Sequence, residues 1–243
     1  MIEIKERIGN FTNSEIYKLA SSLKDGSPSQ AYYTYIKQKV YERYLKRSTS
    51  MNKKNQSMIW GSLLEKRVHY NLPNNYKMMN KQSVVHPKYN FWCGSVDFLV
   101  PNVKVSELKC FEPENFASYT LALMTRDCEK IKAEHPKEYW QIVGNSETNK
   151  VSLGEGITYM PYVSEADEIR EMMQDDDYLK SVGLTLKDLY FIHEKTNMEL
   201  AFLPDDSKFN NLNIYEFEIP INDKIFLTKR VLDANKLLNE MSV

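Results

Sequence analysis

Two carboxylates and a lysine are spaced along the sequence in a way that suits metal-assisted hydrolysis. Asp97 and Glu107 are ten positions apart, and Lys109 follows Glu107 by two positions. Residues i and i+2 of a strand share a face, so Glu107 and Lys109 point the same way, and Asp97 can face them from a neighbouring strand. Carboxylate oxygens hold divalent ions such as Mg²⁺, and a nearby lysine can orient or deprotonate an attacking water. This chemistry suits phosphodiester hydrolysis.

The same charges would also fit the solvent-exposed face of an ordinary strand. Glu-x-Lys triplets are common in a chain with 33 acidic and 32 basic residues, and Glu3-x-Lys5 is a second copy. Burial favours a functional site instead, because buried like charges need a metal ion or another partner. Apolar neighbours predict such burial, namely Val96, Phe98, Leu108 and Cys110.

A hairpin is predicted to position these charges. Residues 91–100 and 103–110 have the pattern of two strands, and Pro101-Asn102 joins them. The other predicted elements are a helix that starts near Thr12-Asn13-Ser14-Glu15, helices over 30–47, 57–71 and 134–147, a strand over 156–163, an acidic helix near 165–177, a strand over 213–219 and a C-terminal amphipathic helix. A sheet in the middle of such an order predicts an α/β fold in one domain, residues 1–243.

Composition excludes several classes of protein. A chain of 243 residues that is 42% hydrophobic can bury a full core. Its three cysteines form no C-x-x-C pair, which disfavours a disulfide framework, a structural zinc site and an iron–sulfur cluster. Mean hydropathy is −0.54, and the charged N-terminus is unlike a signal peptide. We therefore expect a cytoplasmic protein without a membrane span.

The net charge of −1 is the sum of two opposite blocks. Residues 37–67 contain nine basic and two acidic side chains, whereas residues 165–177 contain seven acidic and one basic. The first block would attract a polyanion and the second would repel it. Two ordinary solvated helix faces would give the same pattern.

Five segments resemble the PD-(D/E)xK nuclease superfamily, and within it the phage lambda-exonuclease and YqaJ-type recombination nucleases. They lie in the family's order within residues 7–150: Arg7-Ile8-Gly9-Asn10-Phe11-Thr12-Asn13-Ser14, Trp60-Gly61-Ser62-Leu63-Leu64-Glu65, Gly94-Ser95-Val96-Asp97, Glu107-Leu108-Lys109-Cys110 and Tyr139-Trp140-Gln141. Residues 151–243 would add the closing strands and the last helix. The resemblance implies a restriction-endonuclease-like core, a central mixed sheet flanked by helices.

The resemblance also implies a role for particular residues. Glu65, Asp97, Glu107 and the Leu108 carbonyl would hold Mg²⁺ or Mn²⁺, with Glu65 favouring two ions. Lys109 would position the attacking water, and Gln141 would hydrogen-bond in the same site. Two departures from the family pattern, Val96 for proline and Asn13 for a small residue, are expected to supply no side chain to the chemistry.

The implied substrate is the end of linear double-stranded DNA, digested from 5′ to 3′. Arg7, Ser14 and Ser95 would hold the terminal 5′-phosphate, and a helix that starts near residues 12–14 would suit an anion. Four basic residues are candidates for contacts with the DNA backbone: Lys53, Lys54, Lys66 and Arg67. Family members work beside a single-strand annealing protein and can form rings, so both are candidate partners. An endonuclease with the same core and a catalytically silent DNA-binding scaffold are the alternatives.

Overall fold

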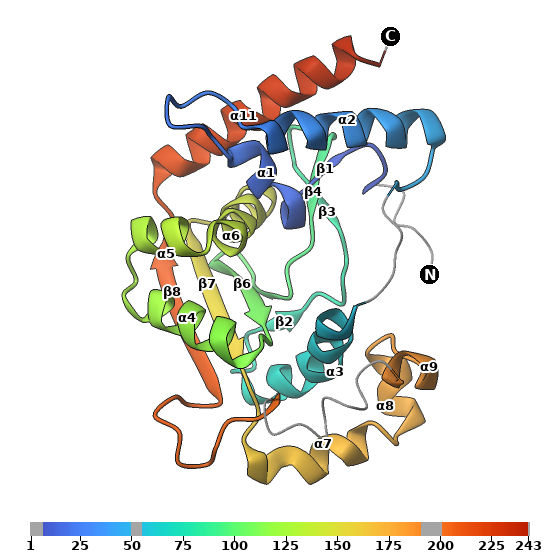
Figure 1. Cartoon of the computed structure of the whole chain (residues 1–243), viewed down its shortest axis with the longest axis vertical. Helices are drawn as coiled ribbons and strands as arrows, with labels where there is room; N and C mark the ends of the chain where they lie inside the picture. The colour runs from blue at the N-terminus through green and yellow to red at the C-terminus, as the bar shows by residue number, and fades with distance from the viewer. Residues whose placement is uncertain (1–6, 50–54, 191–200, 243) are drawn as a thin grey trace.

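A five-stranded mixed sheet lies at the centre of the computed structural model, which describes residues 7–49, 55–190 and 201–242 (Figure 1). The strand order is β2-β5-β6-β7-β8, formed by β2 (Lys77–Met78), β5 (Phe98–Val100), β6 (Lys104–Lys109), β7 (Leu153–Tyr159) and β8 (Leu212–Glu218). Strands β6 and β7 are parallel, and every other neighbouring pair is antiparallel. The predicted central mixed sheet is therefore confirmed.

Helices cover both faces of this sheet, and each face has its own apolar core. The first face carries α4 (Pro113–Met124), α5 (Cys128–Glu134) and α6 (Pro136–Asn149), with α1 (Tyr17–Ala20), α2 (Gln30–Leu45) and α11 (Ile221–Glu240) around α6. The second carries α3 (Gln56–Asn71), α7 (Ala166–Met172), α8 (Asp176–Ser181) and α9 (Leu186–Leu189). Successive β6 side chains alternate between them, because Val105 lies in the first core and Leu108 in the second.

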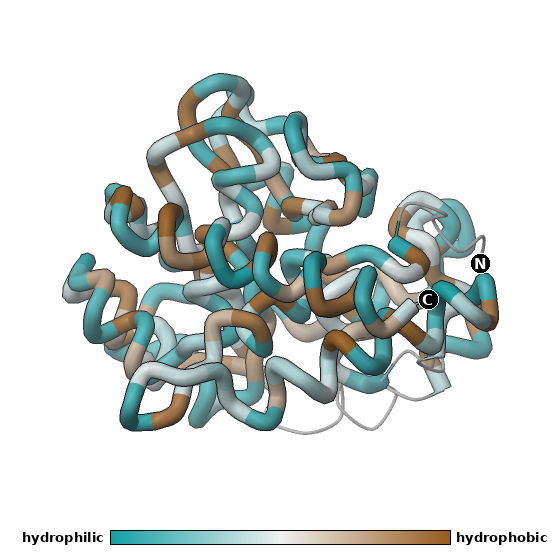
Figure 2. The backbone as a smooth tube through the Cα atoms, turned by 90° about the horizontal axis from the view of Figure 1, so that it is seen from above, coloured by the Kyte–Doolittle hydropathy of each residue, from teal (hydrophilic) through white to brown (hydrophobic). Residues whose placement is uncertain are grey.

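Hydropathy along the chain follows this arrangement. Helices in Figure 2 change between hydrophobic and hydrophilic stretches along the tube, as amphipathic elements do when one face packs on a core. No helix in the part of the chain that the structure describes is long and apolar enough to cross a membrane.

The predicted strand over residues 91–100 is two strands in different sheets. Its first part, β4 (Trp92–Gly94), pairs with β1 (Phe11–Thr12) and β3 (Val84–Val85) in a small three-stranded sheet. Its second part, β5, belongs to the central sheet. Residues 95–97 cross between them. Both parts are mostly buried, so the apolar pattern carries no sign of the change of sheet.

Other predictions differ from the structure at particular elements. The hairpin at Pro101-Asn102 is confirmed, and the helices over 30–47 and 57–71 correspond to α2 and α3. The strand expected over 156–163 is β7, which starts and ends earlier, and α4 was not predicted at all. The acidic region near 165–177 forms α7 and part of α8. The first helix is only a 3₁₀ turn, η2 (Asn13–Glu15), followed by the four-residue α1.

Candidate active site

The hairpin brings Asp97 and Glu107 together. Its register pairs Phe98 with Ser106, so one position further along Asp97 lies opposite Glu107. The Asp97 Oδ2 accepts a hydrogen bond from the backbone N–H of Leu108 (2.8 Å). Repulsion from the Asp97 carboxylate also raises the pKa of Glu107, so the two groups lie close together. Two neighbouring buried carboxyl groups favour a shared proton or a bound cation.

Glu107 is the most enclosed member of the site, with only 3% of the residue exposed. Its Oε1 accepts hydrogen bonds from Lys109 Nζ (2.9 Å) and from Gln141 Nε2. Lys109 Nζ also donates to Gln141 Oε1 (3.2 Å). The structure therefore brings together Glu107, Lys109 and Gln141, although they come from a strand and from helix α6.

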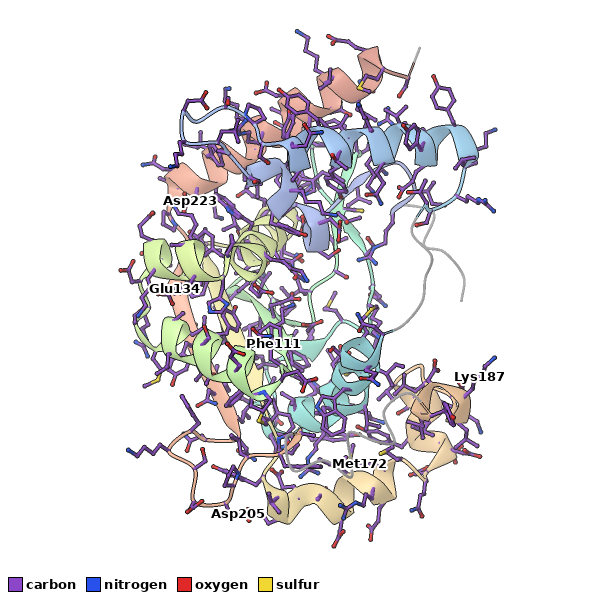
Figure 3. The ribbon with its side chains drawn as sticks, viewed as in Figure 1. Phe111, Glu134, Met172, Lys187, Asp205 and Asp223 are labelled. Atoms are coloured by element: carbon purple, nitrogen blue, oxygen red, sulfur yellow. The ribbon has the colours of Figure 1, made fainter. Side chains whose placement is uncertain are left out.

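Helix α6 supplies a further contact that was not predicted. Asn145 donates from Nδ2 to Glu107 Oε2 (3.1 Å). It lies one helical turn after Gln141, so the spacing i, i+4 was the signal that could have indicated it. The helix is fixed at its start too, because the Tyr139 hydroxyl donates a hydrogen bond to Asp223. Figure 3 labels Asp223 at the start of α11.

Glu65 reaches the site from the opposite core through α3. The residue is 7% exposed, and its Oε1 is buried without a hydrogen-bond partner among the described residues. Asp97 is near enough to raise the pKa of Glu65, whereas Lys81 lowers it. Lys81 itself donates from Nζ to Ser62 Oγ (2.8 Å) on the same helix. Nothing in the sequence pattern indicates Lys81, because it follows the short strand β2 on a turn.

Burial and mutual repulsion raise the pKa values of the three carboxyl groups of the site. Burial raises the pKa of Glu65 to about 7 and that of Glu107 to about 8, with repulsion from Asp97 as the second cause in both. Burial also raises the pKa of Asp97. For Lys109, burial lowers the pKa, but attraction to Glu107 and Asp97 outweighs it and the pKa rises overall. The site is therefore rich in negative charge that one lysine does not neutralise.

The donors of this site fit a divalent cation. Hard oxygen donors are what Mg²⁺ and Mn²⁺ prefer, and the unpartnered Glu65 oxygen and the repulsion between the buried carboxyls of Asp97 and Glu107 indicate a missing positive charge. Leu108, whose carbonyl is the predicted backbone ligand, lies between Glu107 and Lys109 on β6. No three acidic, histidine or cysteine side chains within residues 7–49, 55–190 and 201–242 form a ready-made metal cage.

We expect the protein without divalent cations to lose stability as the pH rises. The unfolded chain releases the Glu107 proton near pH 4.5, whereas the folded chain keeps it to about pH 8. Between these values the folded state binds more protons, so the free energy of unfolding falls with rising pH. Urea unfolding in EDTA from pH 5 to 9 measures this. Glu107→Gln should flatten the profile, and a wild-type profile that rises over this range would contradict the prediction.

The segment that starts at Arg7 approaches the same region from the N-terminal side. Arg7 Nη2 donates to Ser95 Oγ (3.0 Å), while its buried Nε has no partner among the described residues. Ser14 Oγ lies 3.4 Å from Thr12 Oγ1, and no hydrogen bond joins Ser14 to Arg7 or Ser95 in the described chain. The helix start expected to attract an anion here is a 3₁₀ turn and one helical turn, so its dipole is small.

Helix α2 forms hydrogen bonds with the Arg7 segment at Gly9. The Gly9 N–H donates to Glu42 Oε2 (3.0 Å), and Arg43 Nε donates to the Gly9 carbonyl (3.2 Å). Further along, the Thr12 N–H donates to the Tyr35 hydroxyl (2.9 Å). Gly9 has a φ of +68°, and a Cβ there would lie 2.5 Å from Arg43 Cγ. The glycine is thus required by both conformation and space.

A pair of glycine substitutions should separate these two requirements. Gly26 has a φ of +82° with nothing within 4 Å of an added Cβ. Gly26→Ala should therefore cost only the left-handed conformation, about 1–2 kcal/mol, whereas Gly9→Ala should cost about 1–3 kcal/mol more because of the clash. Urea unfolding measures both. Equal losses would show that Arg43 yields without cost.

The candidate DNA-backbone residues have different surroundings. Lys53 and Lys54 lie outside the described residues. Lys66 Nζ donates to Ser181 Oγ (3.0 Å) on α8. Arg67 forms ion pairs with Glu165 and Glu168 and donates to the Tyr159 hydroxyl. The basic and acidic blocks, far apart in sequence, therefore meet between α3 and α7. The charge of Arg67 is already paired with these two carboxylates, which makes this arginine a poor contact for a DNA phosphate.

A comparison with protein families shows which family the chain belongs to. The profile of the YqaJ-like viral recombinase domain matches residues 6–145, which include the hairpin, α3, the Arg7 segment and the part of α6 that ends at Asn145. The chain belongs to the YqaJ-like viral recombinase family. Its matched region ends at Asn145, the side chain that bonds to Glu107.

Solved structures of exonucleases share the fold of this YqaJ-like protein. LHK-Exo in complex with dAMP has 14% identity and a TM-score of 0.61, with 98% of this chain and 92% of the other covered. A second structure of this alkaline exonuclease, from Laribacter hongkongensis, has 14% identity, 97% and 91% coverage and a TM-score of 0.59. A phage-related exonuclease from Haemophilus somnus 129PT has 13% identity, 96% and 94% coverage and a TM-score of 0.57.

The search among curated proteins found no match for the chain. The YqaJ-like family and the exonuclease fold together support a nuclease of the phage recombination type.

Proposed function

We propose that this protein is a Mg²⁺- or Mn²⁺-dependent exonuclease that hydrolyses linear double-stranded DNA from 5′ to 3′. One observation carries the proposal: Asp97 and Glu107 face each other across the hairpin, and Lys109 and Gln141 bond to one Glu107 oxygen. This set suits phosphodiester hydrolysis, because it combines hard oxygen donors with a lysine held beside them. Membership of the YqaJ-like family supports the same substrate class.

Each side chain of the set has a task in this proposal. Glu65, Asp97, Glu107 and the Leu108 carbonyl would hold the cations, and the three carboxylates provide enough charge for two. A bound cation supplies an activated water and stabilises the charge that develops on the phosphate. Lys109, fixed by Glu107 and Gln141, would orient that water and stabilise the developing negative charge. Gln141 keeps Lys109 in place from α6.

The proposed direction rests on the Arg7 segment. Arg7 is held by Ser95 through one guanidinium nitrogen and keeps a buried, unpartnered Nε. A terminal 5′-phosphate would satisfy that donor, because guanidinium groups bind phosphate through paired N–H groups. Ser14 would complete the pocket. A pocket for a chain end favours an exonuclease over an endonuclease with the same core.

Digestion of defined substrates tests this proposal. Linear duplexes with 5′-phosphate or 5′-hydroxyl ends and a covalently closed circle are incubated with Mg²⁺, Mn²⁺ or EDTA. We expect cation-dependent loss of the linear duplex, faster with 5′-phosphate ends, and an intact circle. Cleavage of the circle would support an endonuclease, and no cleavage of any duplex would contradict nuclease activity.

Arg7→Ala should remove only the preference for phosphorylated ends. Its guanidinium contacts Ser95 and not the carboxylates, so the rate on 5′-hydroxyl ends should stay near the wild-type value. The rate on 5′-phosphate ends should fall about 10-fold or more, as expected when a charge-assisted hydrogen bond of about 1.5–3 kcal/mol is lost. Arg170→Ala is the matched control, because that arginine lies on α7 with its charge paired to Asp167. An unchanged phosphate preference in Arg7→Ala would remove the pocket from the proposal.

The proposal also includes contacts with the DNA backbone away from the cleaved end and contacts with other proteins. Of the four predicted candidates for the DNA backbone, Lys66, Lys53 and Lys54 are proposed, and Arg67 is set apart by its ion pairs with Glu165 and Glu168. A single-strand annealing protein and a ring of identical subunits are the proposed partners. Sedimentation of the purified protein with and without DNA ends would establish the ring.

A further inference from the structure

A buried chain of amides joins the Arg7–Ser14 segment to Glu107. Asn13 and Asn145 are each only 1% exposed. Asn13 Nδ2 donates to Asn145 Oδ1 (2.8 Å), and Asn145 Nδ2 donates to Glu107 Oε2 (3.1 Å). The far end of Asn13 is also held, because its Oδ1 accepts from Trp92 Nε1 (2.6 Å). Asn13 is therefore connected to Glu107 through Asn145, while its own side chain does not contact the carboxylates.

The direction of both amides follows from hydrogen-bond chemistry. An indole nitrogen only donates, so the Asn13 oxygen must face Trp92 and its NH₂ group must face Asn145. Asn145 then turns its oxygen to Asn13 and its NH₂ group to Glu107. A carboxylate accepts that hydrogen bond most strongly when ionised. The series from Trp92 to Glu107 thus delivers a donor to the carboxylate, and it favours the form that would bind a cation.

Two glycines make room for this series. A Cβ at Gly94 would lie 1.8 Å from Asn13 Nδ2 and 2.7 Å from Asn145 Oδ1. A Cβ at Gly144 would lie 2.6 Å from Asn13 Oδ1. Backbone from β4 and from α6 therefore closes on the Asn13 amide from two sides. Such a close fit leaves Asn13 little freedom to move without displacing its neighbours.

Two serines of the proposed phosphate pocket lie next in sequence to residues of this hydrogen-bonded series. Ser14 directly follows Asn13, and Ser95 directly follows Gly94, which contacts the Asn13 amide. Arg7 is bonded to Ser95. Binding of a DNA end that displaces either serine would therefore also displace the Asn13 side chain.

We infer that Asn13, acting through Asn145, positions Glu107 and couples occupancy of the DNA-end pocket to the geometry of the catalytic carboxylates. The inference rests on the proposed function for the identity of the end, but not for the positioning of Glu107. Asn13 is a positioning residue in this scheme, since it touches neither the substrate nor a cation. The coupling gives the site a means of favouring hydrolysis when an end is in place.

The test compares Asn13→Ala, Asn145→Ala and the double variant with the wild type. Groups behind a metal ligand typically change metal affinity or activity by about 10- to 100-fold, so Mn²⁺ affinity by calorimetry should fall in that range for each single variant. The rate constant kcat on 5′-phosphate ends should fall with it, and the advantage of phosphate over hydroxyl ends in kcat should disappear for Asn13→Ala. KM for DNA should change little, because Arg7 and Ser95 remain.

Non-additivity separates a relay from a general loss of stability. If Asn13 acts through Asn145, the double variant should bind Mn²⁺ with nearly the same affinity as Asn145→Ala alone. Thr148→Ala is the matched control, since Thr148 accepts from Asn13 (3.2 Å) and donates to the backbone carbonyl of Asn145 (3.0 Å), not to the Asn145 amide that bonds to Glu107. It should keep wild-type Mn²⁺ affinity and phosphate preference. Additive effects of the two asparagine variants, or equal losses in Thr148→Ala, would overturn the inference.

Two outcomes keep this test distinct from that of the proposed function. If Asn13→Ala does not fold, Asn13→Asp replaces it, because aspartate keeps the size and the acceptor for Trp92 but cannot donate to Asn145. If the wild type digests no DNA, the proposed function fails, while Mn²⁺ affinity still decides whether Asn13 positions Glu107. Unchanged Mn²⁺ affinity in both single variants would overturn the positioning role, whatever the enzyme digests.

Discussion

Replacing Lys109 with alanine is expected to slow duplex digestion by about 10²- to 10⁴-fold, the range usually found for a lost general base or acid. Lys109 is the basic side chain hydrogen-bonded to Glu107, and Gln141 fixes its position. The loss should appear in kcat, with KM for DNA almost unchanged. Mn²⁺ binding should not weaken, because removing a positive charge beside the carboxylates favours another cation. Single-turnover digestion and calorimetry measure the two effects separately.

Lys104→Ala is the matched control for this variant. Lys104 lies on the same strand, but it forms ion pairs with Glu155 and Glu216 and not with the site carboxylates. Its loss should reduce the free energy of unfolding, since Glu155 is 1% exposed and would lose its counter-ion. The rate per folded molecule should stay near the wild-type value. A small rate loss in Lys109→Ala, similar to that of Lys104→Ala, would contradict the catalytic role.

Asp97→Asn should abolish cation binding and reduce the rate at least about 100-fold, because a metal ion supplies several kcal/mol of transition-state stabilisation. The asparagine oxygen can still accept from the Leu108 N–H, so the hairpin should be preserved. The metal-free variant should be at least as stable as the wild type at pH 8, since Asp97 repels Glu65 and Glu107. This combination of lost activity and kept stability is typical of a functional carboxylate.

Asp175→Asn provides the corresponding control. Asp175 caps α8 through bonds to the N–H groups of Asp177 and Tyr178, and asparagine caps helices about as well. The same chemical change away from the site should therefore leave cation binding, rate and stability unchanged. If Asp97→Asn binds Mn²⁺ as the wild type does, Asp97 is not a ligand.

The central hairpin could be predicted because its signals are local. The turn residues Pro101-Asn102 and the alternation around Glu107 lie within one short segment, and the confirmed register follows from them. The long helices α2 and α3 were also predictable from periodicity, whereas the mixed sheet was implied by the family resemblance. The split between β4 and β5 was not, because a buried strand looks the same in either sheet.

The surroundings of Glu107 depend on contacts between distant parts of the chain. Asn145 and Asn13 are 132 positions apart, and neither stands out from an ordinary polar residue in its own segment. The same holds for Arg67, whose partners Glu165 and Glu168 lie about a hundred positions later. The charge pattern along the chain predicted an open basic surface. In the structure, packing of α7 against α3 brings acidic residues of the second block into ion pairs with Arg67.

The close fit around the Asn13 amide also restricts how this site can diverge among homologues. A larger residue at position 94 or 144 would occupy the volume of the amide, so it is compatible only with a small side chain at position 13. Loss of that amide would leave Asn145 without its acceptor role and Trp92 without a partner. Positions 13, 92, 94, 144 and 145 should therefore change together in evolution, as residues in mutual contact do.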